Sequence, residues 1–180
     1  MKALIIEDNR FKFQDAIEVL KRHDITEYVH FDNCEEALDF VYEPDNIKNI
    51  DLIILDLNFY MSRELIGGRC RMPTPDAGGK FIWQMLQNEI TTPIIVFSSE
   101  DDYMNVVNHY LFVSFSEYAR IYEKGPLPMT YSQIQRQYDE DIAERRQKLL
   151  DLTFIVGHAH EELELDFFIR QFLQSVNPED

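Results

Sequence analysis

The stretch "DLIILDLNFY", residues 51–60, joins a continuous apolar run to an acidic residue. Four consecutive Leu and Ile residues predict a strand that is buried on both faces. Asp56 follows at the point where such a strand should end. A carboxylate beside an apolar run is costly unless it caps a helix or turn, binds a metal, or lies at the exposed end of the strand. This stretch alone leaves these alternatives open.

The composition is that of a globular protein of ordinary size. The chain has 180 residues, of which 45% are hydrophobic, enough for one well-packed domain. No apolar run approaches the roughly 20 residues that cross a bilayer, and the N-terminus lacks the long apolar region of a signal peptide. Cys34 and Cys70 have no metal-binding spacing and are expected to be free thiols. We therefore expect a cytoplasmic protein without a membrane partner.

The charge is strongly negative. The chain has 33 acidic and 17 basic residues, which give a formal charge of −16 at pH 7. Such a charge repels the phosphate backbone of nucleic acids, so direct nucleic-acid binding is not expected. Solubility, or attraction to a basic partner, accounts for it.

Short apolar segments alternate with amphipathic ones along the chain. The expected strands are 3–7, 28–31, 51–56, 93–98 and 118–124. The expected helices are 10–22, 33–43, 78–89, 101–114 and 130–150. Since parallel strands need connections of helix length, the alternation predicts an α/β fold with a doubly wound, five-stranded parallel sheet.

Two segments lie outside this alternation. Residues 59–75 form a Gly- and Pro-punctuated insertion that is longer than a usual strand-to-helix loop. Residues 151–180 follow the last expected helix and are expected to form a C-terminal helical extension packed on the domain of residues 1–150. Its apolar residues repeat at helical spacing: Leu165, Phe168, Ile169, Phe172 and Val176.

Acidic residues end two of the expected strands. Glu7 and Asp8 follow the first strand, and Asp56 follows the third. In a doubly wound sheet these strand ends meet near the switch point, where ligands bind. Three carboxylates gathered there repel one another, and a hard divalent cation relieves the repulsion. Mg²⁺ fits, because it prefers oxygen ligands and keeps waters that a phosphate can displace.

Two further polar residues end the expected fourth and fifth strands. Ser98 ends the expected fourth strand and Lys124 the expected fifth. A carboxylate beside a metal, a hydroxyl and a lysine can receive a phosphoryl group, because positioning and charge neutralisation supply most of that catalysis.

This ordered set of residues resembles the receiver domains of two-component response regulators, over about residues 1–150. The resemblance implies that Asp56 is the phosphoacceptor and that Glu7 and Asp8 hold Mg²⁺ with it. It assigns the backbone carbonyl of Asn58 to the same metal site. It also implies that Ser98 and Lys124 contact the phosphoryl group.

Two features depart from the family pattern. Gly125 stands between Lys124 and Pro126, where the family has proline directly after lysine. The aromatic position three residues before the lysine is Ile121, and Tyr122 is one place away. The usual relay from the hydroxyl residue to an aromatic side chain is therefore altered or absent.

The resemblance implies a stand-alone response regulator that accepts a phosphoryl group from a histidine kinase or phosphotransfer protein. Phosphorylation, with Mg²⁺, would then switch binding to a downstream protein target, and the chain would not turn over an external substrate. The alternative is a degenerate receiver-like module that binds partners without phosphorylation. A haloacid dehalogenase-type phosphatase is disfavoured because Asn58 stands where that class needs a second Asp.

Further residues have expected roles around this site. Asn58 and Glu100 resemble the residues that tune phosphoryl lifetime in chemotaxis-type receivers. Arginine suits bidentate contact with phosphate, so the insertion is a possible lid or docking loop through Arg63, Arg69 and Arg71. The His-x-His pattern of His158 and His160 is typical of polar surface and has no further clustered ligands.

Overall fold

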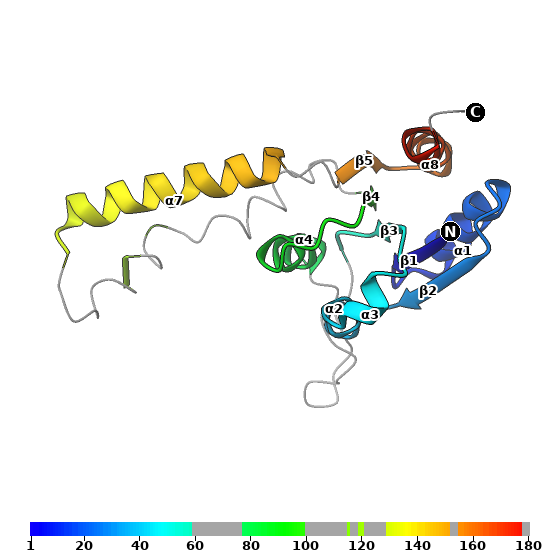
Figure 1. Cartoon of the computed structure of the whole chain (residues 1–180), viewed down its shortest axis with the longest axis horizontal. Coiled ribbons are helices and arrows are strands. Elements are labelled where there is room, and N and C mark those ends of the chain that lie inside the picture. Colours follow the sequence, from blue (N-terminus) through cyan, green and yellow to red (C-terminus); the bar gives the residue numbers. More distant parts are fainter. Residues whose placement is uncertain (59–76, 100–114, 116–118, 121–128, 152–154, 178–180) are drawn as a thin grey trace.

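The computed structural model describes residues 1–58, 77–99, 115, 119–120, 129–151 and 155–177 (Figure 1). The strands are β1 (Lys2–Ile6), β2 (Glu27–Phe31), β3 (Leu52–Leu55), β4 (Ile94–Phe97) and β5 (Ile155–Ala159). The helices are α1 (Arg10–Arg22), α2 (Cys34–Tyr42), α3 (Pro44–Ile47), α4 (Ala77–Gln87), α7 (Tyr131–Asp151) and α8 (Glu162–Val176).

The five strands form one parallel sheet in the order β2-β1-β3-β4-β5. The chain moves outward from β1 to β2, then returns past β1 and continues to β3, β4 and β5. The switch point therefore lies between the carboxyl ends of β1 and β3, where doubly wound sheets bind ligands. The predicted fold class, a doubly wound five-stranded parallel sheet with a C-terminal helix, is confirmed.

The apolar strands divide their side chains between two helical layers. Side chains facing α1 and α8 are Ala3, Ile5, Leu52, Ile54, Ile95, Phe97 and Ala159. Side chains facing α2 and α4 are Leu4, Ile6, Ile53, Leu55, Ile94 and Val96. Successive residues of a strand point to opposite faces, so a strand covered on both faces needs an uninterrupted apolar sequence.

The helices begin where side chains can cap them. The Asn9 side chain accepts hydrogen bonds from the backbone N–H groups of Phe11 and Lys12 at the start of α1. The Asn33 side chain accepts one from Glu36 N, at 2.9 Å, at the start of α2. Each cap satisfies backbone donors that have no partner inside the helix. The first cap fixes the conformation of the chain directly after Glu7 and Asp8.

The fifth strand of the sheet is β5, not the expected segment 118–124. Of that segment, Ala119 and Arg120 are helical and the rest lies outside the described residues. β5 was missed because it contains Gly157 and His158 and is only partly buried, as an edge strand can be. Gly157 is required there, since a Cβ atom would lie 2.2 Å from the ring of Phe168 on α8.

The helix α8 completes the layer that also contains α1. Its Leu165, Ile169 and Phe172 are buried in the same cluster as the strand residues. Arg22 on α1 pairs with Glu162, and His23 Nε2 lies 3.0 Å from Asp166 Oδ1. Residues 155–176 thus belong to the same sheet and core as residues 2–97, and the expected boundary at residue 150 does not mark the end of the sheet.

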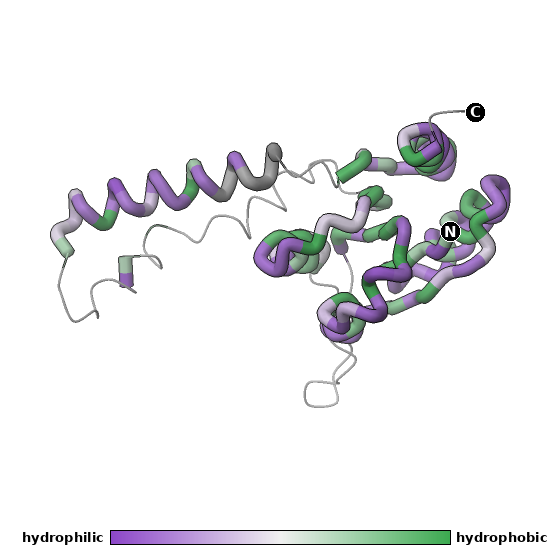
Figure 2. Tube along the Cα trace, viewed as in Figure 1, coloured by the Kyte–Doolittle hydropathy of each residue, from purple (hydrophilic) through white to green (hydrophobic). Residues whose placement is uncertain are grey.

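The helix α7 differs from the others. It extends away from the sheet and is hydrophilic along most of its described length (Figures 1 and 2). Ile134 is buried, in a small apolar cluster with Ala119, Phe115, Met129 and Tyr138. The expected helix over 130–150 is confirmed, but it lies between β4 and β5, before the last strand. The expected helix over 101–114 lies outside the described residues.

Candidate functional site

Three of the candidate site residues follow the carboxyl ends of neighbouring strands. The sheet ladder continues one residue past β1, β3 and β4. Glu7 N donates to Phe31 O (3.1 Å), Asp56 N to Ile6 O (2.9 Å) and Ser98 N to Ala159 O (3.0 Å). These bonds fix the backbone of each polar residue at one edge of the sheet, at and beside the switch point.

Three carboxylates converge at that edge. One ligand oxygen each from Glu7, Asp8 and Asp56 lies within 4.8 Å of the others. Glu7 and Asp56 are buried, and Asp8 is half-buried. Sequence reasoning predicted this cluster, and the structure brings its three members together.

The Glu7 side chain has one satisfied and one unsatisfied oxygen. Its Oε1 accepts a hydrogen bond from Asn9 N at 2.8 Å. Its Oε2 is buried and has no hydrogen-bond partner among the described residues. A buried polar atom without a partner is rare and calls for a missing ligand, ion or water. The orphaned oxygen and the all-oxygen donor set fit a hard divalent cation.

The electrostatics of the cluster agree with this interpretation. The pKa of Glu7 is raised to about 8, chiefly by burial and then by the neighbouring Asp56 charge. The hydrogen bond from Asn9 and the positive charge of Lys12 oppose that rise. A carboxyl whose pKa is raised first by burial and then by a carboxylate neighbour is a group that a divalent cation would ionise.

The Asp56 side chain makes a hydrogen bond and an ion pair with described residues, both through Oδ1. Leu57 N donates to Oδ1 at 2.9 Å, and Lys12 Nζ lies 3.5 Å from it. Neither contact caps a described helix, which was one of the explanations considered for Asp56. Asp56 therefore lies within the carboxylate cluster, with a lysine from α1 beside it.

The helix that follows the insertion packs directly against Asp56. Gly78 N donates to Leu57 O at 3.0 Å. A Cβ atom on Gly78 would lie 2.6 Å from both Asp56 O and Leu57 Cα. Only glycine allows this approach, so the start of α4 holds the backbone of Asp56 and Leu57 in place.

Ser98 is buried just after β4, and its backbone carbonyl is contacted by His158 from β5. His158 Nε2 lies 3.2 Å from Ser98 O, and the rings of His158 and His160 are 4.3 Å apart. His160 N donates to Glu164 Oε2 at 2.7 Å. The end of β5 thus carries histidines and no lysine. Since β5 is not 118–124, the reason for placing Lys124 at a strand end was wrong, and Lys124 itself lies outside the described residues.

The remaining predicted residues are only partly described. Asn58 is exposed, two residues after Asp56. Four others lie outside the described residues, namely Glu100, Arg63, Arg69 and Arg71.

Sequence reasoning missed two residues that the structure places at the site. His30 Nε2 donates to Glu7 O at 2.8 Å, and the ring of His30 stacks on Phe13. Lys12 contacts Asp56. A signal for Lys12 existed, because the first turn of α1 contains basic and no acidic residues. That composition is unfavourable at the positive end of a helix dipole unless an anion lies nearby.

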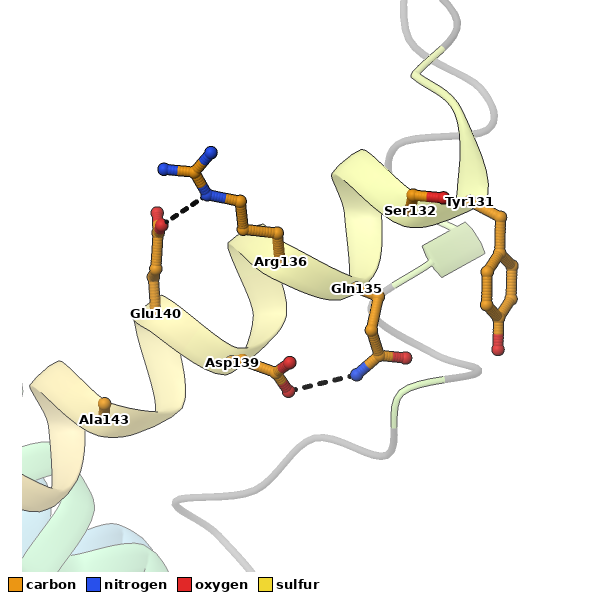
Figure 3. Close-up of a pocket in the computed structure, with 7 residues that line it drawn as sticks. All are labelled: Tyr131, Ser132, Gln135, Arg136, Asp139, Glu140 and Ala143. Carbon is orange, nitrogen blue, oxygen red and sulfur yellow. Dashed lines mark hydrogen bonds and ion pairs between the residues drawn. The ribbon is translucent and has the colours of Figure 1, made fainter.

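An open pocket lies on α7, away from this cluster (Figure 3). Its lining includes Tyr131 and Ala143, and two pairs of lining side chains bond along the helix itself, Gln135 with Asp139 and Arg136 with Glu140. Among the described residues that line the pocket, none is a buried group without a hydrogen-bond partner, in contrast to Glu7 at the sheet edge. None of the described helices is both long enough and apolar enough to span a membrane.

Comparisons with known proteins bear on the fold. No protein-family model matches the chain, and no curated protein matches it. Solved structures do match. The non-phosphorylated receiver domain of the stress response regulator RcsB from Escherichia coli has a TM-score of 0.52 at 12% identity, covering 99% of this chain and 93% of that one.

Two further structures give the same result. The signal receiver domain of an HD domain-containing protein from Pseudomonas fluorescens Pf-5 has a TM-score of 0.52 at 12% identity, covering 99% of this chain and 98% of that one. The phosphorylated cyanobacterial phytochrome response regulator RcpA has a TM-score of 0.51 at 15% identity, with coverages of 96% and 91%. The chain therefore has the fold of the receiver domains of response regulators.

Proposed function

We propose that this chain is a phosphoryl-accepting receiver domain in which Asp56 is the phosphoacceptor. The observation that carries the proposal is the Glu7–Asp8–Asp56 cluster at the switch point of a receiver fold, with a buried and unsatisfied Glu7 oxygen. The donor would be a histidine kinase or a phosphotransfer protein, and the output would be altered binding of a protein target. The protein would act in the cytoplasm, where a thiol such as Cys34 stays reduced.

The cluster suits an in-line transfer to Asp56. An Asp56 carboxylate oxygen attacks phosphorus, the bond between phosphorus and the donor breaks, and its electron pair leaves with the donor. Glu7, Asp8, Asp56 and the backbone carbonyl of Asn58 would hold Mg²⁺, which when bound supplies positive charge against the phosphoryl oxygens. The backbone bonds at Glu7, Asp56 and Ser98 hold the reacting edge rigid, so little reorganisation is needed.

Two side chains have secondary roles in this proposal. Ser98, buried one residue past β4, would donate its hydroxyl to a phosphoryl oxygen. Asn58, exposed two residues after Asp56, would help to orient the water that hydrolyses the acyl phosphate.

Labelling with a small phosphodonor tests the proposal. The parent, incubated with acetyl phosphate and Mg²⁺, should gain one phosphoryl group in its intact mass. Asp56→Asn should gain none, because an amide is not nucleophilic enough to form the acyl phosphate. Asp45→Asn, at an exposed position on α3, is the matched control and should be labelled like the parent. Equal labelling of Asp56→Asn and the parent would overturn the assignment.

The alternative is a receiver-like module that acts without phosphorylation. The observation that favours it is the end of β5, which carries His158 and His160 in place of a lysine. In that case Mg²⁺ would still bind the carboxylates, but the parent would stay unlabelled by acetyl phosphate. The same mass measurement, paired with Mg²⁺ titration calorimetry, therefore separates the two functions.

A further inference from the structure

We propose that Lys12 is the phosphoryl-binding cation of this site, supplied by α1 and not by the end of β5. The inference rests on the proposed function, because it assigns a role in the same phosphoryl transfer. It follows from where the lysine is fixed, what its ammonium group contacts, and how the charges of the site balance.

The backbone of Lys12 is fixed by the carboxylate cluster itself. Glu7 Oε1 accepts from Asn9 N, and the Asn9 side chain in turn accepts from Lys12 N at 3.4 Å. Phe13 N donates to Asn9 O at 2.9 Å, which closes the first turn of α1. A chain of hydrogen bonds thus joins an expected metal ligand to the residue that carries the lysine. The position of Lys12 relative to the cluster is set by these short-range bonds.

The ammonium group of Lys12 lies over the reacting edge of the sheet. Its Nζ is 3.5 Å from Asp56 Oδ1 and 5.8 Å from the centre of the Phe97 ring. Phe97 is the last residue of β4 and precedes Ser98, so the lysine side chain reaches from α1 past the end of β3 toward β4. The lysine side chain is 21% exposed and that of Asp56 is 6% exposed. A partly buried pair of this kind is screened less by solvent than a surface pair.

The lysine occupies a position that is unfavourable for the helix alone. The first turn of a helix is the positive end of its dipole, where acids are favoured and cations are not. Lys12 stands in that turn, and the turn contains no acidic residue. The nearby anions compensate, because the charge of Lys12 also acts on Glu7. The described part of the chain gives this lysine no other anionic contact than the carboxylate cluster.

Charge balance gives the lysine a function after transfer. Three ionised carboxylates, one divalent cation and Lys12 sum to zero. When the Asp56 oxygen bonds phosphorus and the donor leaves with its electron pair, the singly charged carboxylate becomes a phosphoryl group of about two negative charges. The added charge falls beside Asp56, within reach of an ammonium group already held there. Lys12 then exchanges its contact with the carboxylate for one with a phosphoryl oxygen.

The test compares three variants of the full chain with the parent. Lys12→Met removes the charge but keeps an apolar stem against Phe97, and Lys12→Arg keeps the charge. Arg10→Met is the matched control, because it removes the same charge from an exposed position in the same turn. The measurements are the initial rate of labelling by acetyl phosphate with Mg²⁺, the affinity for Mg²⁺ alone by calorimetry, and the melting temperature.

We expect labelling of Lys12→Met to slow by about tenfold or more, as for other lost transition-state contacts. Its affinity for Mg²⁺ should be equal to or tighter than that of the parent, since a competing cation is gone. Lys12→Arg should recover most of the rate, and Arg10→Met should match the parent. Melting temperatures near that of the parent would show that the variants fold.

Three results would overturn the role of Lys12: a Lys12→Met rate within about twofold of the parent, equal slowing of Arg10→Met, or slowing explained by weaker Mg²⁺ binding. In all three the parent is still labelled on Asp56, so the proposed function stands. A parent that acetyl phosphate never labels would instead overturn the proposed function, and the role of Lys12 with it.

Discussion

Two acidic regions in the described part of this chain, the sheet edge and α7, have different surroundings. On α7, Asp139 and Glu140 are each paired one turn back along the helix. Gln135 Nε2 donates to Asp139 Oδ1 at 3.0 Å, and Arg136 Nε to Glu140 Oε1 at 2.8 Å (Figure 3). At the sheet edge, Glu7 and Asp56 are buried against each other, and one Glu7 oxygen has no partner among the described residues.

The acidic residues on α7 are stabilised by solvent, whereas the acidic residues at the sheet edge need a ligand. Pairs on an exposed helix form and break at little cost, because water solvates both partners. Carboxylates crowded in a buried cluster destabilise one another unless protons or cations neutralise them. The raised pKa of Glu7 reflects its burial first and the neighbouring Asp56 charge second. The same residue types therefore predict function in one region and solubility in the other.

Divalent-cation binding should show the largest contrast between the two regions. Glu7→Gln or Asp8→Asn removes a ligand charge, and the affinity for Mg²⁺ should fall by about a hundredfold or more, beyond the loss typical of groups that only support ligands. Titration calorimetry measures the affinity. Glu140→Gln on α7 is the matched control and should bind as the parent does. Equal affinities for Glu7→Gln and Glu140→Gln would remove the metal site from the sheet edge.

The pH dependence of stability should show the next largest contrast. The folded pKa of Glu7 is about 8, above its ordinary value of 4.5. Between these values the folded chain holds a proton that the unfolded chain releases. The stability from this proton is fully present below the ordinary pKa, falls as pH rises, and is gone above the folded pKa. The total should be on the order of a few kcal/mol.

Thermal melting without divalent cations measures this effect between about pH 5 and about pH 9. Glu7→Gln should lose most of the pH dependence, since its amide does not titrate. Added Mg²⁺ should stabilise the parent more at the upper end of the range, because metal binding requires the ionised carboxylate. A parent that becomes more stable with rising pH in metal-free buffer would contradict the raised pKa of Glu7 and the burial and crowding that cause it.

The sequence predicted most of the fold because the central strands carry a strong signal. β1, β3 and β4 are buried on both faces, so their apolar runs are uninterrupted. β5 is a half-buried edge strand with Gly157 and His158, and its sequence shows no such run. The segment 118–124 looked more strand-like by composition than β5 does. Apolar content reports burial on two faces and fails where a strand has one exposed side.

The sequence likewise predicted some residues of the site and missed others. Glu7, Asp8 and Asp56 follow central strands, so locating the strands located the residues. Lys12 projects from a helix, and its contact with Asp56 depends on how α1 packs on the sheet. Strand order from sequence does not supply that packing. The misplaced fifth strand also gave Lys124 a role by position that the end of β5 does not support.

A third contrast tests how rigidly each region is held. Gly78→Ala should cost about 1–3 kcal/mol, because the added Cβ meets the backbone of Asp56 and Leu57 at 2.6 Å. It should also weaken Mg²⁺ binding by shifting Asp56. Ala143→Gly, on the exposed face of α7, should cost about 1 kcal/mol or less and leave Mg²⁺ binding unchanged. Chemical denaturation and calorimetry give the two quantities. Unaltered Mg²⁺ binding in Gly78→Ala would show that α4 does not position Asp56.

The smallest effect should come from the ion pair on α7. Arg136 and Glu140 are both exposed, and their contact joins two flexible side chains that water solvates well. Arg136→Ala, Glu140→Ala and the double variant should melt at the parent temperature within error, in low and high salt alike. A double-mutant cycle isolates the pair from the effect of each substitution on the helix. A clear coupling that disappears in high salt would mean that the α7 acids are not simply solvated surface. In that case the strength of the interactions made by the acidic residues would no longer distinguish α7 from the sheet edge. The two regions would then differ only in how deeply those residues are buried.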